Sequence, residues 1–267
     1  MTQEGYRDLS GLVPTLSGKV ALVSGAGSQG PGVGTGRAAA LLLAAHGACV
    51  LAIDRDLGSA EETAAHATEL PGQIVPFAAD LSGPEGCRSA AEAAVERWGH
   101  VDILDNNLGV VGPGTVLTAS WPDWERVIRL NVLSAAALSA AVIPHMPPGG
   151  SIVNIASIAA FRPHAITPYS TSKGAVIALT QSMALDHAPA GIRVNCVAPG
   201  PIYTPMVAGS MTPELRERRR LASPLREEGT AWDIASAVRF LVSEEARWIT
   251  GAVLPVDGGV SLQSPER

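Results

Sequence analysis

Short runs of Val, Ile and Leu alternate with longer alanine-rich stretches along almost the whole chain, and this alternation strongly limits the possible folds. The short runs are apolar throughout, as expected of strands buried on both faces of a parallel sheet. The stretches between them have helical spacing, which suits the crossover that joins two parallel strands. The pattern predicts a single doubly wound α/β sheet of about seven strands with helices on both faces.

The expected elements follow from this pattern. The expected strands are residues 20–24, 49–54, 73–79, 101–106, 151–155, 193–198 and 253–256. The expected helices are residues 36–46, 57–69, 83–98, 122–143, 169–187 and 230–242. Residues 201–229 interrupt the alternation with several prolines and a charged run, and we expect a mobile lid with a short helix there. We expect one domain over 18–260, an N-terminal extension at 1–17 and a C-terminal tail at 261–267.

Charge and cysteine content argue against several partners and sites. The 267-residue chain has a net charge of −6, so it lacks the basic field that concentrates nucleic acid. Cys49, Cys87 and Cys196 are widely spaced and form no Cys-x-x-Cys, so we expect neither a disulfide framework nor a thiolate metal site. The six histidines also lack metal-ligand spacing. We expect no metal and a location in the reducing cytoplasm.

Membrane association is not expected either. Residues 1–17 lack the apolar core of a signal peptide. The longest alanine-rich apolar run, residues 132–143, is too short to cross a bilayer.

A glycine-rich turn, residues 24–37, follows the first expected strand. Glycines at such a turn let backbone amides approach a pyrophosphate, and the next helix adds partial positive charge at its N-terminus. A literal Gly-x-Gly-x-x-Gly match starts at Gly25, but a helix beginning there would have to pass through a proline and further glycines. The helical pattern begins near Thr35, so we assign Gly25, Gly34 and Gly36 to the phosphate-binding turn. The intervening residues then form an insertion; a flexible surface loop is the alternative.

Asp54 strengthens the prediction of a dinucleotide site. It ends the second expected strand, where an acidic side chain accepts hydrogen bonds from the adenosine ribose hydroxyls. Its negative charge would repel the 2′-phosphate of NADP, so NAD is the expected cofactor. Arg55 could partly offset that repulsion, and the alternative for Asp54 is an ordinary solvated residue at a strand end.

Three further residues point to proton transfer at the same end of the sheet. Tyr169 and Lys173 lie four residues apart at the start of a helix, so they project from one face. An ammonium beside a phenol favours the phenolate and should lower the pKa of Tyr169. Ser157 follows a central strand at its carboxyl end, where open α/β sheets bind ligands.

Taken in order, these residues resemble the short-chain dehydrogenase/reductase family, and the resemblance extends over residues 16–259. Further segments similar to those of the family are Asp80-Leu81, Asn106-Asn107-Leu108-Gly109, Asn131, residues 199–204 and residues 256–259. Two departures are the lengthened glycine turn and a spacing from Ser157 to Tyr169 that is one residue shorter than is common in the family. The first leaves open which amides hold the pyrophosphate, and the second bears on the shape of the substrate pocket.

The resemblance implies hydride transfer between a nicotinamide and an alcohol or ketone carbon. Tyr169 would exchange the proton of the substrate oxygen, and Ser157 would hydrogen-bond that oxygen. Lys173 would lower the pKa of Tyr169 and hold the nicotinamide ribose, while Asn131 would anchor a water relay behind Lys173. Each of these side chains has a purely structural alternative.

The resemblance also implies the cofactor site and an assembly. The residues expected to bind the cofactor are Gly25, Gly34, Thr35, Gly36, Asp54, Arg55, Asp80, Leu81, Asn106, Gly109, Tyr169, Lys173, Pro199, Gly200, Ile202 and Thr204. Family members commonly pair alanine-rich helices between subunits, so a homotetramer or homodimer is implied.

The substrate is the least determined part of the prediction. The residues that select it should lie in 110–115, 158–168 and 203–226, where several apolar side chains favour a neutral, small or cyclic secondary alcohol or its ketone. A 3-oxoacyl thioester on an acyl carrier is the alternative, with the arginines between 216 and 220 as its contact. Two other classes are a nucleotide-sugar epimerase or dehydratase, which typically has a larger C-terminal domain, and a non-catalytic redox sensor.

Overall fold

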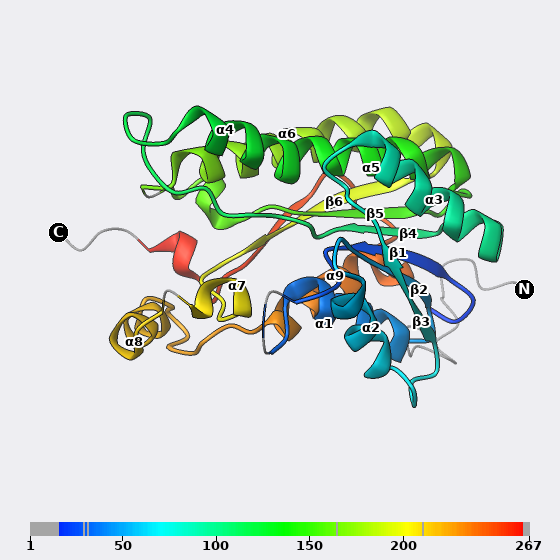
Figure 1. The fold of residues 1–267 in the computed structure, drawn as a ribbon, viewed down its shortest axis with the longest axis horizontal. Helices are drawn as coiled ribbons and strands as arrows, with labels where there is room; N and C mark the ends of the chain where they lie inside the picture. Colours follow the sequence, from blue (N-terminus) through cyan, green and yellow to red (C-terminus); the bar gives the residue numbers. More distant parts are fainter. Residues whose placement is uncertain (1–15, 29, 31, 164, 210, 264–267) are drawn as a thin grey trace, which may run out of the picture.

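Seven parallel strands form one twisted sheet in the computed structural model, which describes residues 16–28, 30, 32–163, 165–209 and 211–263. The strand order is β3-β2-β1-β4-β5-β6-β7, and helices cover both faces (Figure 1). The strands are β1 (Val20–Ser24), β2 (Cys49–Asp54), β3 (Gln73–Ala78), β4 (Ile103–Asn106), β5 (Ser151–Ile155), β6 (Arg193–Pro199) and β7 (Val253–Val256). The predicted doubly wound sheet is confirmed, with strand ends that differ by one or two residues.

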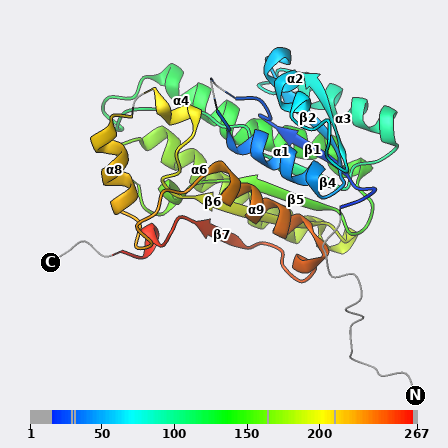
Figure 2. The ribbon, with the colours of Figure 1, turned by 90° about the horizontal axis from the view of Figure 1, so that it is seen from below.

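The helices form two layers, and each layer packs on one hydrophobic core. One layer contains α1 (Thr35–Ala45), α2 (Leu57–Ala65) and α9 (Ala231–Val242), with α1 packed closely against α9. The other contains α3 (Pro84–Trp98), α4 (Trp121–Ile128), α5 (Ser134–Val142) and α6 (Thr167–His187) (Figures 1 and 2). Strand residues alternate between the cores: Ile103 packs toward α1 and α9, and Leu104 packs toward α3 and α5.

The helix expected at residues 122–143 has a more complex form. A π-helical segment, Arg129–Leu133, joins α4 to α5, so the chain is helical from Trp121 to His145. By length and composition alone, this helix could cross a membrane, because the apolar run of 132–143 is only part of it. The apolar run is therefore part of a longer helix than the sequence pattern indicated. In the fold, α5 packs against α3, and α4 packs against α6.

The stretch between β6 and α9 contains two helices rather than one. They are α7 (Pro205–Ala208) and α8 (Pro213–Leu221), and they lie together at one end of the molecule (Figure 1). The expected lid therefore has more regular structure than the sequence indicated.

The expected terminal segments are only partly covered by the structure. Residues 1–15 of the N-terminal extension lie outside the described residues, and the Leu16 amide donates to the carbonyl of His46 at 2.7 Å. Residues 264–267 of the C-terminal tail also lie outside them. The 3-10 helix Val260–Leu262 follows β7 and lies at the end of the molecule that holds α7 and α8 (Figures 1 and 2). The division into extension, domain and tail stays a prediction.

Candidate active site

The carboxyl ends of the strands gather most of the predicted site residues at one edge of the sheet. Ser24, Asp54 and Asn106 end β1, β2 and β4, and Pro199 ends β6. The strand order reverses between β1 and β4, which is where open α/β sheets form a ligand crevice. The glycine turn therefore lies beside that crevice.

Two of the predicted glycines are required by close backbone contacts. A Cβ on Gly36 would lie 2.1 Å from the carbonyl oxygen of Gly25, and one on Gly25 would lie 3.1 Å from Leu108 Cα. Gly25 also has a φ of +64°, which side chains other than glycine rarely adopt. Helix α1 begins at Thr35, so the literal motif at Gly25 does not mark the helix start.

The hydrogen bonds of the turn indicate which amides remain for a pyrophosphate. The amides of Ala26, Gly27 and Ser28 already donate to Ile53 O, Asp54 Oδ2 and Ser59 Oγ, at 3.0, 3.1 and 2.7 Å. Gly34 is the N-cap of α1, has extended backbone and supplies no side-chain cap.

Because no side chain caps the 11-residue helix α1, the backbone amides of its first turn fit an anionic group.

Asp54 is held in place by the turn that it faces. Its Oδ2 accepts from the Gly27 amide, and its Oδ1 accepts from the Asp56 amide at 3.1 Å. A Cβ on Gly27 would lie 2.7 Å from Asp54 Oδ2, so this glycine allows the approach. Sequence reasoning did not assign Gly27 a role.

Arg55 and Asp80 flank the same strand ends and are exposed. The pKa of Asp80 lies below its usual value, mainly because the Ser82 backbone and side chain hydrogen-bond to it, and the charge of Arg55 contributes. Leu81, by contrast, is buried in the core beside α3. Its contact with a cofactor stays a prediction.

The two asparagines that follow Asp105 have different surroundings. Asn106 Nδ2 donates to Asn154 Oδ1 at 2.8 Å and to Ser139 Oγ at 3.0 Å, so its side chain points into the core. Asn107 Oδ1 accepts from Thr35 Oγ1 at 2.7 Å, at the first turn of α1. Asn107 therefore connects β4 to the glycine turn, although the residues expected to bind the cofactor include Asn106 and not Asn107.

Tyr169 and Ser157 lie on either side of the connection from β5 to α6. Ser157 caps the 3-10 helix Ile158–Ala160, and its Oγ accepts from the Ala159 amide at 3.1 Å. Burial raises the pKa of Tyr169, and a hydrogen bond with the Ser157 side chain lowers it by a smaller amount.

Lys173 is buried, with 3% of its surface exposed, and its Nζ donates to the carbonyl oxygen of Ile155 at 2.7 Å. Burial lowers the pKa of Lys173 to about 8. Its Nζ lies 5.7 Å from the centre of the Tyr169 ring.

The expectation of a lowered pKa for Tyr169 is wrong for this structure, because desolvation of the phenol outweighs the effects that stabilise the phenolate.

Asn131 lies in the π-helical segment and links two parts of the site. Its Oδ1 accepts from the Val110 amide at 2.7 Å, and its Nδ2 donates to Val110 O at 3.0 Å and to Ser172 Oγ at 2.9 Å. A Cβ on Gly109 would lie 3.1 Å from Lys173 Nζ, so Gly109 is beside the lysine. The role of Asn131 as a water anchor stays a prediction.

The segment after β6 is fixed against the end of β7. Gly200 donates to Val256 O at 2.9 Å, and a Cβ on it would lie 2.5 Å from Asp257 Cα. The carbonyl of Ile202 accepts from Arg219 at 3.1 Å, and the buried Thr204 is the N-cap of α7. Ile202 and Thr204 therefore lie on the segment that connects the sheet edge to the lid.

The donors and acceptors at this edge fit a nicotinamide dinucleotide. The uncapped first turn of α1 suits a pyrophosphate, Asp54 suits ribose hydroxyls, and Gly25 and Gly36 leave room only for backbone. Among the described residues, no group of three or more His, Cys, Asp or Glu side chains is placed to hold a metal ion.

Comparison with known proteins agrees with this arrangement. A family model described as enoyl-(acyl carrier protein) reductase matches residues 31–261. A structure of a short-chain dehydrogenase/reductase from Burkholderia xenovorans superposes with a TM-score of 0.90 at 36% identity, covering 94% of this chain and 100% of that one. The chain belongs to the short-chain dehydrogenase/reductase family of oxidoreductases, whose cofactors are nicotinamide dinucleotides.

Several characterised relatives have different substrates. The chain is 38% identical to a 2-(R)-hydroxypropyl-CoM dehydrogenase of Xanthobacter autotrophicus, covering 90% of this chain and 97% of that protein. It is 34% identical to the 3-oxoacyl-[acyl-carrier-protein] reductase of Thermotoga maritima, with coverage of 92% and 99%. A 7α-hydroxysteroid dehydrogenase in complex with NADH and 7-oxo glycochenodeoxycholic acid gives a TM-score of 0.86 at 35% identity, with coverage of 92% and 95%.

Proposed function

We propose that the protein interconverts a secondary alcohol and a ketone with NAD(H), and that Tyr169 is the general acid and base. The observation that carries this proposal is the juxtaposition of Tyr169 with Ser157 and Lys173. The Ser157 side chain is close enough to Tyr169 to lower its pKa, and Lys173 Nζ lies 5.7 Å from the centre of the Tyr169 ring.

Each side chain has a definite part in the proposed reaction. The dinucleotide, when bound, accepts the hydride from the carbinol carbon or returns it to the ketone carbon. Tyr169 takes the hydroxyl proton during oxidation and gives it back to the ketone oxygen during reduction. Ser157 hydrogen-bonds the same substrate oxygen. Lys173 Nζ donates to Ile155 O in this structure and would also donate a hydrogen bond to the nicotinamide ribose.

The proposed preference for NAD rests on Asp54. Its carboxylate accepts hydrogen bonds from the Gly27 and Asp56 amides and forms no ion pair among the described residues. The positive charge of Arg55, which could offset that of Asp54, also acts on Asp80 and helps to lower the pKa of that residue. A 2′-phosphate about 4 Å from Asp54 would be repelled by roughly 1–4 kcal/mol. That range corresponds to about 5- to 1000-fold in affinity.

The lid arginines give little support to the acyl thioester alternative. Arg216 forms an ion pair with Glu228 and stacks 3.8 Å over the ring of Tyr203. Arg220 pairs with Glu217. Arg216 and Arg220 therefore hold the lid together, which leaves the exposed Arg218 as the contact for an acyl carrier. Exposed Phe161 and Met206 on the neighbouring segments favour a substrate with an apolar part.

The proposed assembly and location rest on other residues. Exposed apolar side chains occur on the helical layer that contains α4 and α6, including Trp121 at 73%, Leu133 at 56% and Leu185 at 80% exposure. Such a face suits pairing with a second copy, and we propose a homotetramer or homodimer. Cys49, Cys87 and Cys196 are free thiols, which fits the proposed cytoplasmic location.

The test is NADH-monitored turnover of a panel of ketones and secondary alcohols by the wild type and by Tyr169→Phe, with NADPH in parallel. Loss of general acid–base catalysis should lower kcat by roughly 10²- to 10⁴-fold. Binding of NADH should remain, because the substitution removes only the hydroxyl. Undiminished turnover by Tyr169→Phe would overturn the mechanism. NADH binding without turnover of any panel member would favour a redox sensor.

A further inference from the structure

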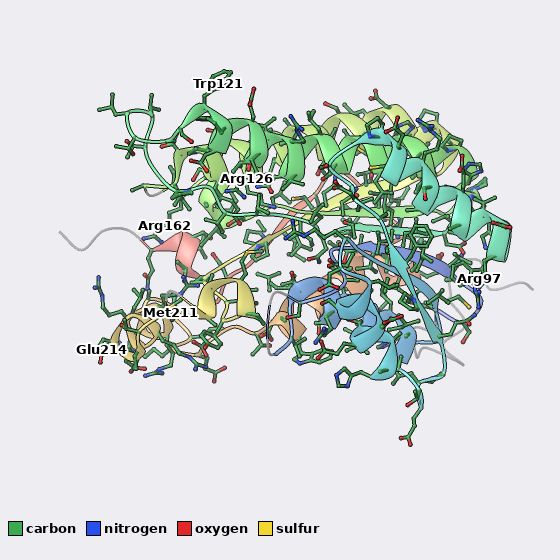
Figure 3. The ribbon with its side chains drawn as sticks, in the orientation of Figure 1. Arg97, Trp121, Arg126, Arg162, Met211 and Glu214 are labelled. Atoms are coloured by element: carbon green, nitrogen blue, oxygen red, sulfur yellow. The ribbon has the colours of Figure 1, made fainter. Side chains whose placement is uncertain are left out.

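Arg162 is a charged residue on the substrate side of the site with no role in the proposed reaction. It follows the 3-10 helix Ile158–Ala160, and its amide donates to Ile158 O at 2.7 Å, which fixes the backbone at this position. Figure 3 places Arg162 at the end of the molecule that holds the lid, and its charge acts on Asp257, which precedes the 3-10 helix Val260–Leu262. In the sequence, Arg162 lies on the connection between Ser157 and Tyr169.

The guanidinium of Arg162 is incompletely satisfied. Its Nη1 is buried and has no hydrogen-bond partner. The nearby carboxylate is Asp257, whose pKa is lowered in part by the charge of Arg162. Asp257 already accepts from the Gly259 amide at 2.9 Å and the Ser261 amide at 2.7 Å, and no ion pair joins it to Arg162 among the described residues. Arg162 is half-buried, so a ligand can reach the guanidinium, and a charged donor left without an acceptor is costly enough to favour binding of a ligand acceptor.

Few other charged side chains near the substrate are placed for this role. Residues 110–115 and 158–168 contain no lysine, no carboxylate and no arginine other than Arg162. Of the lid arginines, Arg216 and Arg220 pair with glutamates, Arg219 donates to Ile202 O, and Arg218 and Arg226 are exposed. Arg162 thus combines a position between Ser157 and Tyr169 with an unused donor.

We propose that Arg162 binds an oxyanion of the substrate, a carboxylate or sulfonate at a distance from the reacting carbon. The planar guanidinium donates two parallel hydrogen bonds to such a group, and burial strengthens them. The inference rests on the proposed function, since it names the substrate class of the same site. It replaces the expectation of a wholly neutral substrate with that of an oxo acid or hydroxy acid that has an apolar middle.

The experiment compares substrates that differ only in charge. A straight-chain series of methyl-ketone carboxylates of increasing length is tested with NADH beside the methyl ester and the sulfonate of each length. The wild type should prefer at least one oxyanion to its ester by roughly 10- to 100-fold in kcat/KM. This factor corresponds to the free energy of one hydrogen bond to a charged group. Carboxylate and sulfonate arms identify which oxyanion fits. Equal or better turnover of the esters at every length overturns the inference.

Variants assign the preference to one residue. Arg162→Met should abolish the preference for the oxyanion by raising its KM, with little change in kcat for the ester. Arg162→Lys should restore part of the preference. Arg129→Met is the matched control, since it removes an exposed arginine of the π-helical segment and should leave the preference intact. Loss of the preference in Arg218→Met, on the exposed face of α8, but not in Arg162→Met assigns the oxyanion to the lid and overturns the inference.

A binding measurement separates this inference from the proposed function. Carboxylates and esters are titrated against each protein in the presence of NADH, with the quenching of NADH fluorescence as the signal. Absence of turnover with every ketone, together with carboxylate binding that Arg162→Met abolishes, overturns the proposed reaction and keeps the oxyanion site. Turnover of esters without carboxylate binding keeps the reaction and overturns the site.

Discussion

Lys173 Nζ donates to the main-chain carbonyl of Ile155, the last residue of β5, at 2.7 Å. This bond holds the ammonium at the carboxyl edge of the sheet, while the surrounding core keeps water away from it. The lysine is thus positioned by the strand that precedes Ser157. Because of this burial, the Lys173 ammonium loses its proton more readily than it would in water.

The pH dependence of cofactor capture should therefore report Lys173. Burial lowers its pKa from 10.5 to about 8, so the ammonium is present below that pH and is lost as the pH rises through it. We expect kcat/KM for NADH, which reports ionisations of the enzyme before the cofactor binds, to fall as the pH rises above about 8. The measurement is this parameter from pH 6 to 10.

Lys173→Arg provides the diagnostic comparison, because a guanidinium stays charged throughout this range. The variant should be less active at every pH but should lack the alkaline fall. Lys19→Arg, in an ion pair with Asp102, is the matched control and should keep the wild-type profile. An unchanged alkaline fall in Lys173→Arg would assign it to another group.

Gly36→Ala should disrupt the phosphate-binding turn. The added Cβ would lie 2.1 Å from Gly25 O and 3.2 Å from Ala26 Cα, and both neighbours are backbone atoms that cannot rotate away. We expect a loss of stability of roughly 1–3 kcal/mol. We also expect NADH affinity to fall by about 10-fold or more, since 1.4 kcal/mol of lost binding suffices.

Urea unfolding and NADH titration measure the two effects. Gly174→Ala is the control, because Gly174 lies within α6 and no atom outside the neighbouring backbone of that helix lies within 4 Å of its added Cβ. Wild-type affinity in Gly36→Ala would show that the turn can relax.

Asp54→Asn should weaken discrimination against NADP(H). The amide oxygen can still accept from the Gly27 amide, so the turn keeps its shape while the negative charge is removed. We expect the ratio of kcat/KM for NADPH to that for NADH to rise by about 10-fold, within the range given by roughly 1–4 kcal/mol of repulsion. Asp56→Asn is the matched control, because Asp56 caps α2 through the Gly58 amide. A similar rise in both variants would indicate a general charge effect.

Periodicity and turn chemistry were sufficient to predict the sheet and the start of α1. The apolar runs identified all seven strands, because a parallel sheet buries both faces of each strand. Residues 31–34 contain a proline and two glycines, which a helix interior rarely accepts, so the start at Thr35 was accessible from the sequence.

Long-range contacts were not accessible in the same way. Nothing local indicates that Asn106 turns into the core while Asn107 bonds Thr35, because the two residues are of the same type and the difference depends on the pleat of β4. The raised pKa of Tyr169 depends on burial by distant segments. The unpaired nitrogen of Arg162 likewise depends on the packing of the C-terminal segment.

Asp105 leads to a prediction about stability that is independent of catalysis. It lies on β4, fully buried, with Oδ1 unpaired and Oδ2 accepting from Asn107 Nδ2 at 3.2 Å. Burial raises its pKa from 3.8 to about 7. Between these two values the folded protein holds a proton that the unfolded chain has lost, so the stability falls as the pH rises through this window.

Asp105→Asn removes this titration while keeping the shape of the protonated acid. The variant should therefore be more stable than the wild type at pH 8 by roughly 1–4 kcal/mol, and the difference should shrink towards pH 4. Urea unfolding followed by circular dichroism at pH 4, 6 and 8 measures it. Asp102→Asn should have the opposite effect at pH 8, because Asp102 accepts from Lys19 Nζ and the Val20 amide, each at 2.9 Å. A wild type more stable than Asp105→Asn at pH 8 would mean that the buried carboxylate is stabilised by a partner when charged.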